Sequence, residues 1–362
     1  MNLTIDKPYP MTQQATIATD HLLKDIAVVI LNWNGSSMLA EYLPSVVEHS
    51  AAAARIIVAD NGSTDDSLAM LREHFPMVEL IELDRNYGFA EGYNRALAQV
   101  EAAYYVLLNS DVEVTPHWLQ PLREYMDAHP DTAACQPKLL SAINHSMFEY
   151  AGAAGGMLDR YGYAYCRGRV FDVVESDKGQ YEQPISVDWA TGACLFIRAS
   201  DYRVSGGLDA RFFAHFEEID LCWRLRLRGR TIACVPQSTV YHLGGGTLPQ
   251  GNPQKTYLNF RNNLTMLHKC LLPAQCRRVM RMRWLLDNVA AWKALILDRN
   301  IKEFKAIRKA RKDFKQWRED FPNEALLLAE QGFTPTPSSA PDIVVLWQYY
   351  FRHKRLFSQF PQ

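Results

Sequence analysis

Short apolar runs alternate with amphipathic stretches through the first third of the chain. Strands are predicted where the runs are compact and β-prone, and helices where apolar residues recur three or four positions apart. Strand and helix alternate four times with short connections, which favours a mostly parallel, Rossmann-like α/β sheet flanked by helices. The predicted strands are residues 25–31, 55–59, 78–83 and 104–108, and the predicted helices are residues 37–50, 68–75 and 94–100.

Polar and acidic residues follow three of these strands, as Asn32-Trp-Asn-Gly35, Asp60-Asn-Gly-Ser-Thr-Asp-Asp66 and Asn109-Ser-Asp111. In an open parallel sheet, ligands collect at the carboxyl ends of the strands. Mg²⁺ or Mn²⁺ takes one or two carboxylate oxygens there together with nucleotide phosphates. The other interpretation of Asp111 is that it caps the turn before the next helix.

The middle of the chain is less regular, and the end is helical. We expect strands at 135–140, 187–198, 231–236 and 240–243, a Gly- and Tyr-rich excursion at 150–185, and a helix at 217–228 that Gly229 ends. Helices follow from residue 255, including 301–317, then a Pro-rich linker at 335–341 and a tail at 343–351 that packs back as a last helix. The predicted domains are a flexible leader (1–24), a first α/β half (25–115), a second, less regular half (116–254) and a helical region (255–362).

Charge is distributed unevenly. Residues 255–320 hold 17 Lys or Arg against 6 Asp or Glu, although the whole chain has a net charge of −1. This basic segment favours a polyanionic partner or surface, with a solvated helix face as the other interpretation. The seven scattered cysteines fit reduced thiols better than a disulfide framework or zinc site. No apolar run approaches the ~18 residues of a membrane span, and the polar N-terminus does not resemble a signal peptide.

Seven motifs in the same order resemble the family 2 glycosyltransferases, with the bacterial rhamnosyltransferase-like branch the most similar. The resemblance covers about residues 25 to 270, and the order of the motifs makes it far more specific than any one of them. They are residues 28–35, 58–65, 86–94, 107–113, 188–193, 212–221 and 240–242.

The resemblance implies a GT-A fold, a nucleotide-diphosphate sugar donor, a divalent metal (Mn²⁺ or Mg²⁺) and inversion at the anomeric carbon. It makes residues 25–115 the nucleotide-sugar-binding half and residues 116–254 the acceptor and catalytic half of the GT-A domain. Asp111 matches the last position of the family's D-x-D metal motif, whose first position is here Asn109, and His242 is the implied second metal ligand. A structural histidine and, at Asp60, a simple Asx-turn remain alternatives. The implied donor-binding residues are Asn32, Asn34, Asp60, Asn86, Gly88, Asn94, Asn109 and Arg261.

The acidic pair Glu217-Glu218 matches the family's catalytic position, and Glu218 is the implied general base where Asp is common. Such a base removes the proton of the acceptor hydroxyl, and two adjacent buried carboxylates raise one pKa toward neutrality. The alternative is that these acids, with Asp220, only favour the positive end of a helix. The implied acceptor and sugar pocket comprises Trp189, Thr191, Gly192 and Glu217, although a core tryptophan is an equal interpretation of Trp189.

The sequence therefore predicts a cytoplasmic transferase that adds a sugar, by branch similarity rhamnose, to a bacterial surface polysaccharide or a polyprenyl-diphosphate-linked glycan. The basic helices give the inner face of the plasma membrane, an anionic surface, as a further candidate partner. A catalytically silent nucleotide-sugar-binding protein is the main alternative, which Asn109 and Glu218 permit. A dinucleotide-dependent oxidoreductase ranks low because no G-x-G-x-x-G follows the first strand. No nucleic-acid-reading motif accompanies the basic segment.

Overall fold

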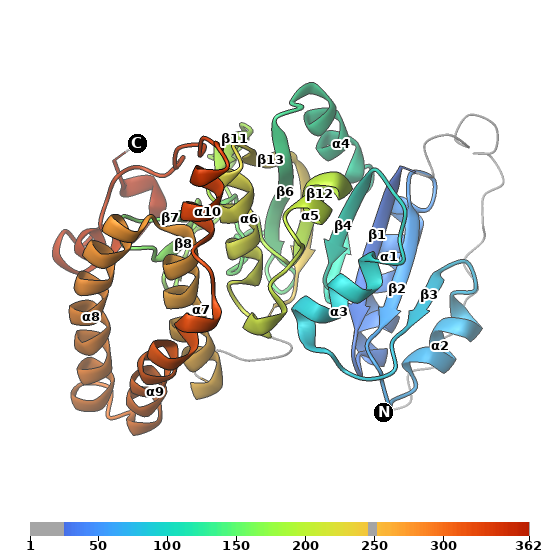
Figure 1. Cartoon of the computed structure of the whole chain (residues 1–362). Helices are drawn as coiled ribbons and strands as arrows, with labels where there is room; N and C mark the ends of the chain where they lie inside the picture. Colours follow the sequence, from blue (N-terminus) through green and yellow to red (C-terminus); the bar gives the residue numbers. More distant parts are fainter. Residues whose placement is uncertain (1–24, 245–251, 362) are drawn as a thin grey trace.

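The computed structural model describes residues 25–244 and 252–361, so the predictions for the leader and for residues 245–251 lie outside the described residues. A nine-stranded sheet crosses the molecule, and a helical C-terminal region lies at one end of it (Figure 1). Alternate residues of the first strand enter two different cores: Val28 packs with helices on one face, and Val29 with helices on the other. This is the helix–sheet–helix layering that the apolar strands predict.

The N-terminal half confirms the predicted alternation of strands and helices. All four of its strands are parallel, in the spatial order β4-β1-β2-β3. The strands are β1 (Ile26–Asn32), β2 (Arg55–Asp60), β3 (Glu79–Glu82) and β4 (Tyr104–Leu108), and the helices are α1 (Ser36–Ser50), α2 (Ser67–His74) and α3 (Gly88–Leu97).

Two local predictions in this half are wrong. Helix α3 begins at Gly88, not Asn94, so these two residues belong to a helix rather than to a loop. Helix α2 has Asp66 at its N-cap, not Ser63 or Thr64. The reason for both is tertiary, because the side chains concerned bond to neighbouring loops, as described below.

The second half continues the same sheet, whose full order is β11-β13-β6-β12-β4-β1-β2-β3, with β5 paired to β13. β6 and β13 run in the direction of the first four strands, whereas β12, β11 and β5 run against them. The sheet is thus mixed but mostly parallel. Its elements here are β5 (Val112–Val114), α4 (Leu119–Ala128), β6 (Thr132–Ser141), β11 (Ile185–Val187), β12 (Cys194–Arg198), α5 (Ala199–Val204), η1 (Ala210–Phe212), α6 (Glu217–Leu227) and β13 (Thr231–His242).

Long-range pairing changes two of the predicted strands. The strand predicted at 187–198 is two strands, β11 and β12, on different neighbours. Those predicted at 231–236 and 240–243 are the single strand β13, which keeps its pairing to β6 across an irregularity between Val235 and Thr239. The excursion at 150–185 forms a small antiparallel sheet of β7 (Gly156–Leu158), β8 (Ala164–Cys166), β9 (Arg169–Val170) and β10 (Val173–Val174).

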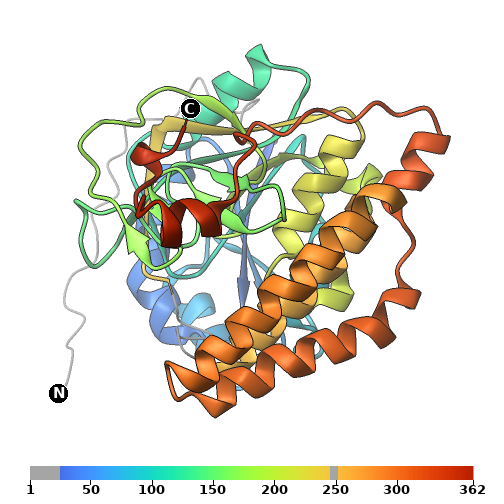
Figure 2. The same ribbon diagram turned by 90° about the vertical axis from the view of Figure 1, so that its left-hand side faces the viewer.

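The C-terminal region confirms the helical prediction, and its helices pack together on one side of the molecule (Figure 2). The tail packs back, as expected: Val345 is buried, and the Tyr349 hydroxyl donates to Oδ1 of Asp172 in the excursion (2.7 Å). The elements are α7 (Pro253–Cys270), α8 (Pro273–Ile296), α9 (Ile301–Trp317), η2 (Arg318–Asp320), α10 (Glu324–Glu330), η3 (Trp347–Phe351, a π-helical turn) and η4 (Phe357–Gln359).

All seven cysteines are buried as free thiols. Among residues 25–244 and 252–361, no helix has both the length and the apolar character required to cross a bilayer.

Candidate active site

The polar ends of β1 and β2 lie side by side, because the two strands are parallel and pair Asn32 with Asp60. Nδ2 of Asn32 donates to Oδ1 of Asp60 (3.0 Å), and the other carboxylate oxygen accepts from the backbone of Ser63 (2.9 Å). The bond from the Ser63 backbone forms the Asx-turn that was the alternative interpretation of Asp60, and the Asp60 side chain is 1% exposed. A contact from Asp60 to a nucleoside stays a prediction. Oδ1 of Asn32 is buried without a hydrogen-bond partner and remains available to a ligand.

The loops after β1 and β2 are bonded to each other. Oδ1 of Asn34 accepts from the backbone of Thr64 (2.7 Å), and the backbone of Asn34 donates to the Ser63 hydroxyl (2.9 Å). This tertiary use of Ser63 and Thr64 explains why neither caps helix α2. Asn34 itself has a φ of +51°, a conformation that asparagine tolerates better than most residues.

The loop after β3 is fixed in the same way. The Asn61 amide donates to Oδ1 of Asn86 (3.1 Å) and to the carbonyl of Gly88 (3.0 Å), and accepts from the backbone of Tyr87 (2.9 Å). Oδ1 of Asn86 also accepts from the backbone of Gly88 (2.8 Å), which satisfies a donor at the start of α3. These bonds let the helix begin several residues earlier than the sequence pattern predicts.

Two of the predicted donor-binding residues have structural contacts. Asn94 bonds the backbone of Leu208 in both directions (2.7 and 3.0 Å) and accepts from the Tyr202 hydroxyl (2.6 Å), so it ties α3 to the segment after α5. Gly88 has a φ of +78°, and a Cβ there would lie 3.0 Å from the ring of Phe213. Gly88 and Asn94 therefore lie in helix α3 rather than in a loop, and a contact of either with the donor stays a prediction.

Asp111 and His242 meet at the next strand ends. β5 places Val112 opposite His242, and Oδ1 of Asp111 lies 3.2 Å from Nε2 of His242. Nδ2 of Asn109 lies 3.4 Å from the same nitrogen. On the other side of the ring, Nδ1 lies 3.4 Å from Oε1 of Glu149, whose second oxygen accepts from the backbone of Ala151 (2.6 Å). A carboxylate that faces the far nitrogen of an imidazole is the usual outer partner of a metal-binding histidine.

The charge balance of this cluster suits a cation. Burial lowers the pKa of His242, but Asp111 and Glu149 outweigh it and raise the pKa to about 10. Burial raises the pKa of Asp111, and the contact with His242 more than offsets this, so that the pKa lies below its ordinary value. Asp111, whose side chain is 13% exposed, and the buried Glu149 thus face the two nitrogens of one imidazole. Within the described residues no group of three or more His, Cys, Asp and Glu side chains is arranged to hold a metal ion.

Glu217 and Glu218 are the first two residues of helix α6, and each has a carboxylate oxygen that lacks a hydrogen-bond partner. Glu217 is 5% exposed, and one carboxylate oxygen of each residue is buried without a hydrogen bond. Burial raises the pKa of both carboxyl groups, and the charge of Glu218 raises that of Glu217 further. The expectation of a raised pKa in this pair is confirmed, and a base with such a pKa is suited to proton abstraction near neutral pH.

Asp220, three positions into the same helix, has a structural role instead. It is fully buried and accepts from Arg224 (2.7 Å) and from Lys269 of α7 (2.9 Å). The ion pair fixes α6 against α7, and the neighbouring acids are left as the reactive candidates.

The loop before α6 is strained. Phe213, His215 and Phe216 have φ values of +68°, +67° and +71°, a region that non-glycine residues rarely adopt. Asn262 of α7 is fully buried, and its amide donates to three carbonyls of this loop, those of Phe212 (3.1 Å), Ala214 (2.8 Å) and His215 (2.7 Å). Strain that is held by such a network is typical of functional sites.

His215 itself presents a second unsatisfied group. Its Nε2 atom is buried without a hydrogen-bond partner. Burial, with a smaller effect from the charge of Lys255, lowers its pKa to about 4, so the ring is neutral at physiological pH.

The segment before β12 joins the metal candidates to the acid pair. The carbonyl of Ala193 accepts from the backbone of Asn109 (3.0 Å), directly beside Asp111. The adjacent Gly192 packs on the catalytic candidate, since a Cβ there would lie 3.6 Å from Cβ of Glu218.

The environment of Cys166 also indicates that the metal candidates and the acid pair lie near each other. Burial raises the pKa of its thiol to about 11, and the charges of Glu149 and Glu218 both contribute. Glu149 contacts His242, so the predicted metal ligands and the predicted base border one region of the molecule. If the predicted metal ligands and the predicted base lay in separate regions, they could not belong to one active site.

For the predicted sugar pocket, the structure favours the core interpretation of Trp189. The indole is 2% exposed, donates to the carbonyl of Met157 (3.0 Å) and packs directly on Gly156. Thr191 is also buried, and its backbone donates to Oε1 of Gln136 (3.0 Å). Trp189 and Thr191 precede Gly192 in the chain, and because both side chains are buried, neither is exposed for contact with a sugar.

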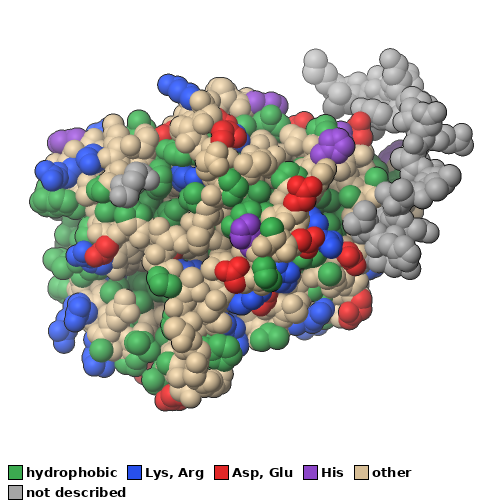
Figure 3. All heavy atoms as spheres, turned by 90° about the horizontal axis from the view of Figure 1, so that it is seen from above, with side chains coloured by type: hydrophobic (Ala, Val, Ile, Leu, Met, Phe, Trp, Pro, Cys, Tyr) green, Lys and Arg blue, Asp and Glu red, His purple; other side chains and the backbone are tan. Residues whose placement is uncertain are grey.

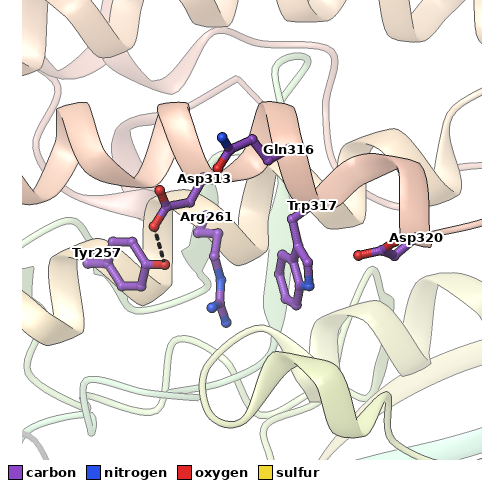
Figure 4. Close-up of a pocket in the computed structure, with 6 residues that line it drawn as sticks. All are labelled: Tyr257, Arg261, Asp313, Gln316, Trp317 and Asp320. Carbon is purple, nitrogen blue, oxygen red and sulfur yellow. Dashed lines mark hydrogen bonds between the residues drawn. The ribbon is translucent and has the colours of Figure 1, made fainter.

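Arg261 lies in a cavity of about 290 Å³ between α7 and α9 (Figure 4). Its guanidinium stacks on the ring of Trp317 (4.0 Å) and donates to the carbonyl of Phe212 (3.2 Å). Tyr257 and Asp313, also on the cavity wall, bond to each other (2.8 Å). Arg261 thus reaches the back of the strained loop, and a contact with donor phosphates stays a prediction.

Sequence reasoning missed one residue of the site, Glu149, which directly precedes the irregular excursion and is marked by no period or motif. Asn262 was predicted, together with Arg261, to lie near the donor phosphates, but its bonds to the strained loop were not predicted.

Comparison with known proteins shows which family part of the chain matches. Residues 27–142 match the model of the family described as Glycosyl transferase family 2, a span that contains Asp60 and Asp111 but ends before Glu218 and His242. N-acetylglucosaminyl-diphospho-decaprenol L-rhamnosyltransferase of Mycobacterium tuberculosis is 26% identical over 234 residues, which cover 60% of this chain and 75% of the relative. Rhamnosyltransferase WbbL of Escherichia coli is 27% identical over 199 residues, covering 52% and 72%.

Solved structures share the fold. A crystal structure of GalNAc-T7 with UDP, GalNAc and Mn²⁺ aligns with a TM-score of 0.57 at 15% identity, over 88% of this chain and 60% of the other. The crystal structure of S. aureus TarS aligns with a TM-score of 0.52 at 16% identity, over 84% and 50%. The chain therefore spans about half to three fifths of these two proteins, and the likeness establishes the GT-A fold.

Proposed function

We propose that this chain, a family 2 glycosyltransferase similar to the rhamnosyltransferases, transfers a sugar from a nucleotide-diphosphate donor to a glycan or polyprenyl-diphosphate-linked acceptor, with inversion at the anomeric carbon. Rhamnose is the first candidate sugar, because two of the similar proteins are named rhamnosyltransferases. One of these names specifies an N-acetylglucosaminyl-diphospho-decaprenol acceptor, so we propose an acceptor of that chemistry and a reaction at the inner face of the membrane.

The observation that supports the proposal is that one segment, Gly192-Ala193, contacts both the predicted base and the strand end that carries the predicted metal ligand. Asp111 and His242 form a buried, negatively biased cluster, and Glu218, beside Gly192, has a carboxylate oxygen without a partner. Unpaired buried polar atoms cost free energy, so their presence favours a ligand that satisfies them.

The residues at the edge fit a divalent metal. Asp111 and His242 would hold it, with Asn109 beside them and Glu149 orienting the imidazole, and two protein ligands leave room for diphosphate oxygens. When bound, the metal neutralises charge on the departing diphosphate.

The remaining steps belong to the protein side chains. Glu218, deprotonated, accepts the proton of the acceptor hydroxyl as its oxygen attacks the anomeric carbon, and the bond from that carbon to the diphosphate breaks on the opposite face. Burial and the charge of Glu218 raise the pKa of Glu217, and in its protonated form Glu217 can donate a hydrogen bond to the acceptor. Gly192 has no side chain, so the acceptor can approach Glu218 closely.

The test is a panel of thymidine-, uridine- and guanosine-diphosphate sugars, screened by thermal shift with and without Mn²⁺. We expect one donor, a rhamnose nucleotide first, to stabilise the protein only when the metal is present. Mass spectrometry then measures transfer of its sugar to N-acetylglucosaminyl-diphospho-polyprenol. Binding without transfer, equal in the wild type and in Glu218→Gln, would favour the catalytically silent alternative and contradict the proposal.

A further inference from the structure

Exposed apolar side chains gather on one element of the C-terminal region. Seven large apolar residues that are at least half exposed fall within 284–301, and three more fall within 347–351, whereas elsewhere among the described residues they occur singly. Patches of this kind mark interaction sites. They are Trp284 (57%), Leu285 (50%), Val289 (58%), Trp292 (51%), Ile296 (65%), Leu297 (72%) and Ile301 (54%).

The exposed side of helix α8 carries basic side chains in its first part and apolar side chains in its second part. Positions three or four apart share a helix face, and the exposed face runs basic at its start and apolar at its end. Over the 18 positions from Arg278 to Ile296 this face is about 27 Å long. The opposite side is buried and includes Val279, Arg283 and Asp287. The residues of the exposed side, called here the α8 face, are Arg278, Arg281, Leu285, Val289, Trp292 and Ile296.

The C-terminal tail extends this surface. Trp347 and Phe351 are both more than half exposed and stack on each other with ring centroids 4.5 Å apart. The pKa of Lys293 on α8 is raised by its hydrogen bond to Asp298 and, to a smaller extent, by the phenol of Tyr350, so this tail residue lies within electrostatic range of the apolar end of α8.

Basic side chains surround the apolar part. Arg299 and Lys302 are exposed next to Leu297 and Ile301, and Arg352 is exposed next to the tail aromatics. On the left of Figure 3, the side on which α8 lies in Figure 1, hydrophobic side chains and Lys and Arg side chains lie next to each other at the surface.

We propose that the α8 face, together with the tail aromatics, docks on an anionic phospholipid bilayer, with its apolar side chains in the headgroup region and its basic side chains on lipid phosphates. The proposal rests on the proposed function in one respect, because a lipid-linked acceptor lies in such a membrane. Tryptophan and tyrosine between apolar and basic side chains are typical of a helix that lies in the membrane interface.

Charge decides between this occupant and a second copy of the chain. Residues 255–320 carry 17 Lys or Arg against 6 Asp or Glu, so a symmetric dimer through the α8 face would place two strongly basic regions against each other. Like charges opposed across an interface are unfavourable. An anionic bilayer supplies the complementary charge, at roughly 1 kcal/mol for each Lys or Arg near its surface.

Flotation of the full chain with vesicles tests the proposal. We expect binding to vesicles of equal parts phosphatidylglycerol and phosphatidylethanolamine, weak binding to phosphatidylcholine vesicles, and weaker binding in high salt. The triple variant Leu285→Ser, Val289→Ser, Ile296→Ser should bind about tenfold less tightly, because its three exposed apolar side chains no longer enter the interface. Arg278→Glu with Arg281→Glu should lose binding by a similar factor.

The matched control is the triple variant Met77→Ser, Ile143→Ser, Val204→Ser, which removes equally exposed apolar side chains from other surfaces. It should bind vesicles as the wild type does. Circular dichroism and thermal melting of all variants separate loss of docking from loss of folding. Unchanged vesicle binding in the folded α8 variants overturns the proposal, as does a wild-type dimer that the α8 variant converts to a monomer.

Transfer to a water-soluble acceptor analogue separates this proposal from the proposed function. The α8 variants should transfer to the analogue at the wild-type rate and lose transfer only to acceptor in vesicles. A wild-type chain that binds vesicles but transfers to neither acceptor refutes the proposed function and leaves docking intact. A chain that transfers to the analogue but does not float with anionic vesicles refutes docking alone.

Discussion

The two halves of the sheet edge use their polar side chains in opposite ways. After β1, β2 and β3, the side chains of Asn34, Asn61 and Asn86 bond to neighbouring loops, so the backbone there is fixed before any ligand arrives. Around α6, by contrast, Glu217 and Glu218 are buried with unpaired oxygens.

The difference indicates two kinds of preorganisation. The first half holds loop shape through satisfied hydrogen bonds, with Oδ1 of Asn32 as its exception. The second half holds carboxylate oxygens of Glu217 and Glu218 without hydrogen-bond partners, which costs free energy. The Asp220 ion pairs and the Asn262 hydrogen bonds stabilise the surrounding structure and offset this cost. Binding would therefore depend on the first half and turnover on the second, and substitutions can separate the two.

The largest expected effect is that of Glu218→Gln. Removal of a general base lowers kcat by about 10²- to 10⁴-fold, while the donor-induced thermal shift stays at its wild-type size. The control is Glu217→Gln, where we expect less than about tenfold loss, because a protonated Glu217 and a glutamine can both donate a hydrogen bond. If Glu217→Gln lowered kcat more than Glu218→Gln did, Glu217 would be the general base and Glu218 the hydrogen-bond donor.

A substitution at Glu149 should act on the metal. Glu149→Gln removes the carboxylate opposite Nδ1 of His242, and loss of such an outer partner weakens metal affinity by about 10- to 100-fold. Titration of Mn²⁺ followed by paramagnetic resonance measures this without turnover. Asp111→Asn should weaken the affinity more, since it alters the ligand itself. Wild-type Mn²⁺ affinity in both variants would show that the cluster is an ordinary buried ion pair.

The strained loop should relax when Asn262 is truncated. Asn262→Ala removes the side-chain donor of the Ala214 and His215 carbonyls, whereas that of Phe212 keeps its bond from Arg261. The expected cost is about 1–3 kcal/mol in the free energy of unfolding, with a lower kcat at unchanged donor KM. Asn263→Ala is the matched control: it is the next buried asparagine, and its amide donates to Gly162 in the excursion instead (2.7 Å). Urea unfolding should show similar destabilisation in both, and only Asn262→Ala should lower kcat at a temperature where both are folded.

The smallest effect concerns stability and pH. Burial raises the pKa of Glu217 in the folded protein, so the folded state binds more protons than the unfolded one above about pH 4.3, and stability falls as pH rises from there. Glu217→Gln should remove this fall, by about 1.4 kcal/mol for each pH unit of raised pKa. Urea unfolding from pH 5 to 8 measures it, and parallel curves for the two proteins would contradict the assignment.

The first half supplies a control of opposite sign. Burial raises the pKa of Asp65, but its hydrogen bonds with Ser67 and Ser36 lower it overall. Its contribution to stability is therefore present above the unfolded pKa and is lost as pH falls through the folded one. Asp65→Asn should lose a small amount of stability at neutral pH, small because the residue is exposed.

Much of the fold was predictable where the pattern is local. Compact apolar runs gave β1, β2 and β4, and the 301–317 periodicity gave α9 with its observed bounds. The antiparallel direction of β12 was not predictable, because it depends on which strands it meets rather than on its own residues. The start of α3 was missed for the same reason, since Asn61 and Asn86 satisfy its first donors from outside the helix.

The sequence by itself determined the motif order, the acidic pair and the polar strand ends, because these are properties of residue type and spacing. Only the tertiary structure decided what each group contacts. It buried Trp189 and engaged Asn94, it added Glu149 from a distant segment, and it gave Asn262 the strained loop as its partner. Burial and partners arise from packing between elements far apart in the chain, and they decide which polar groups hold the fold and which are left for chemistry.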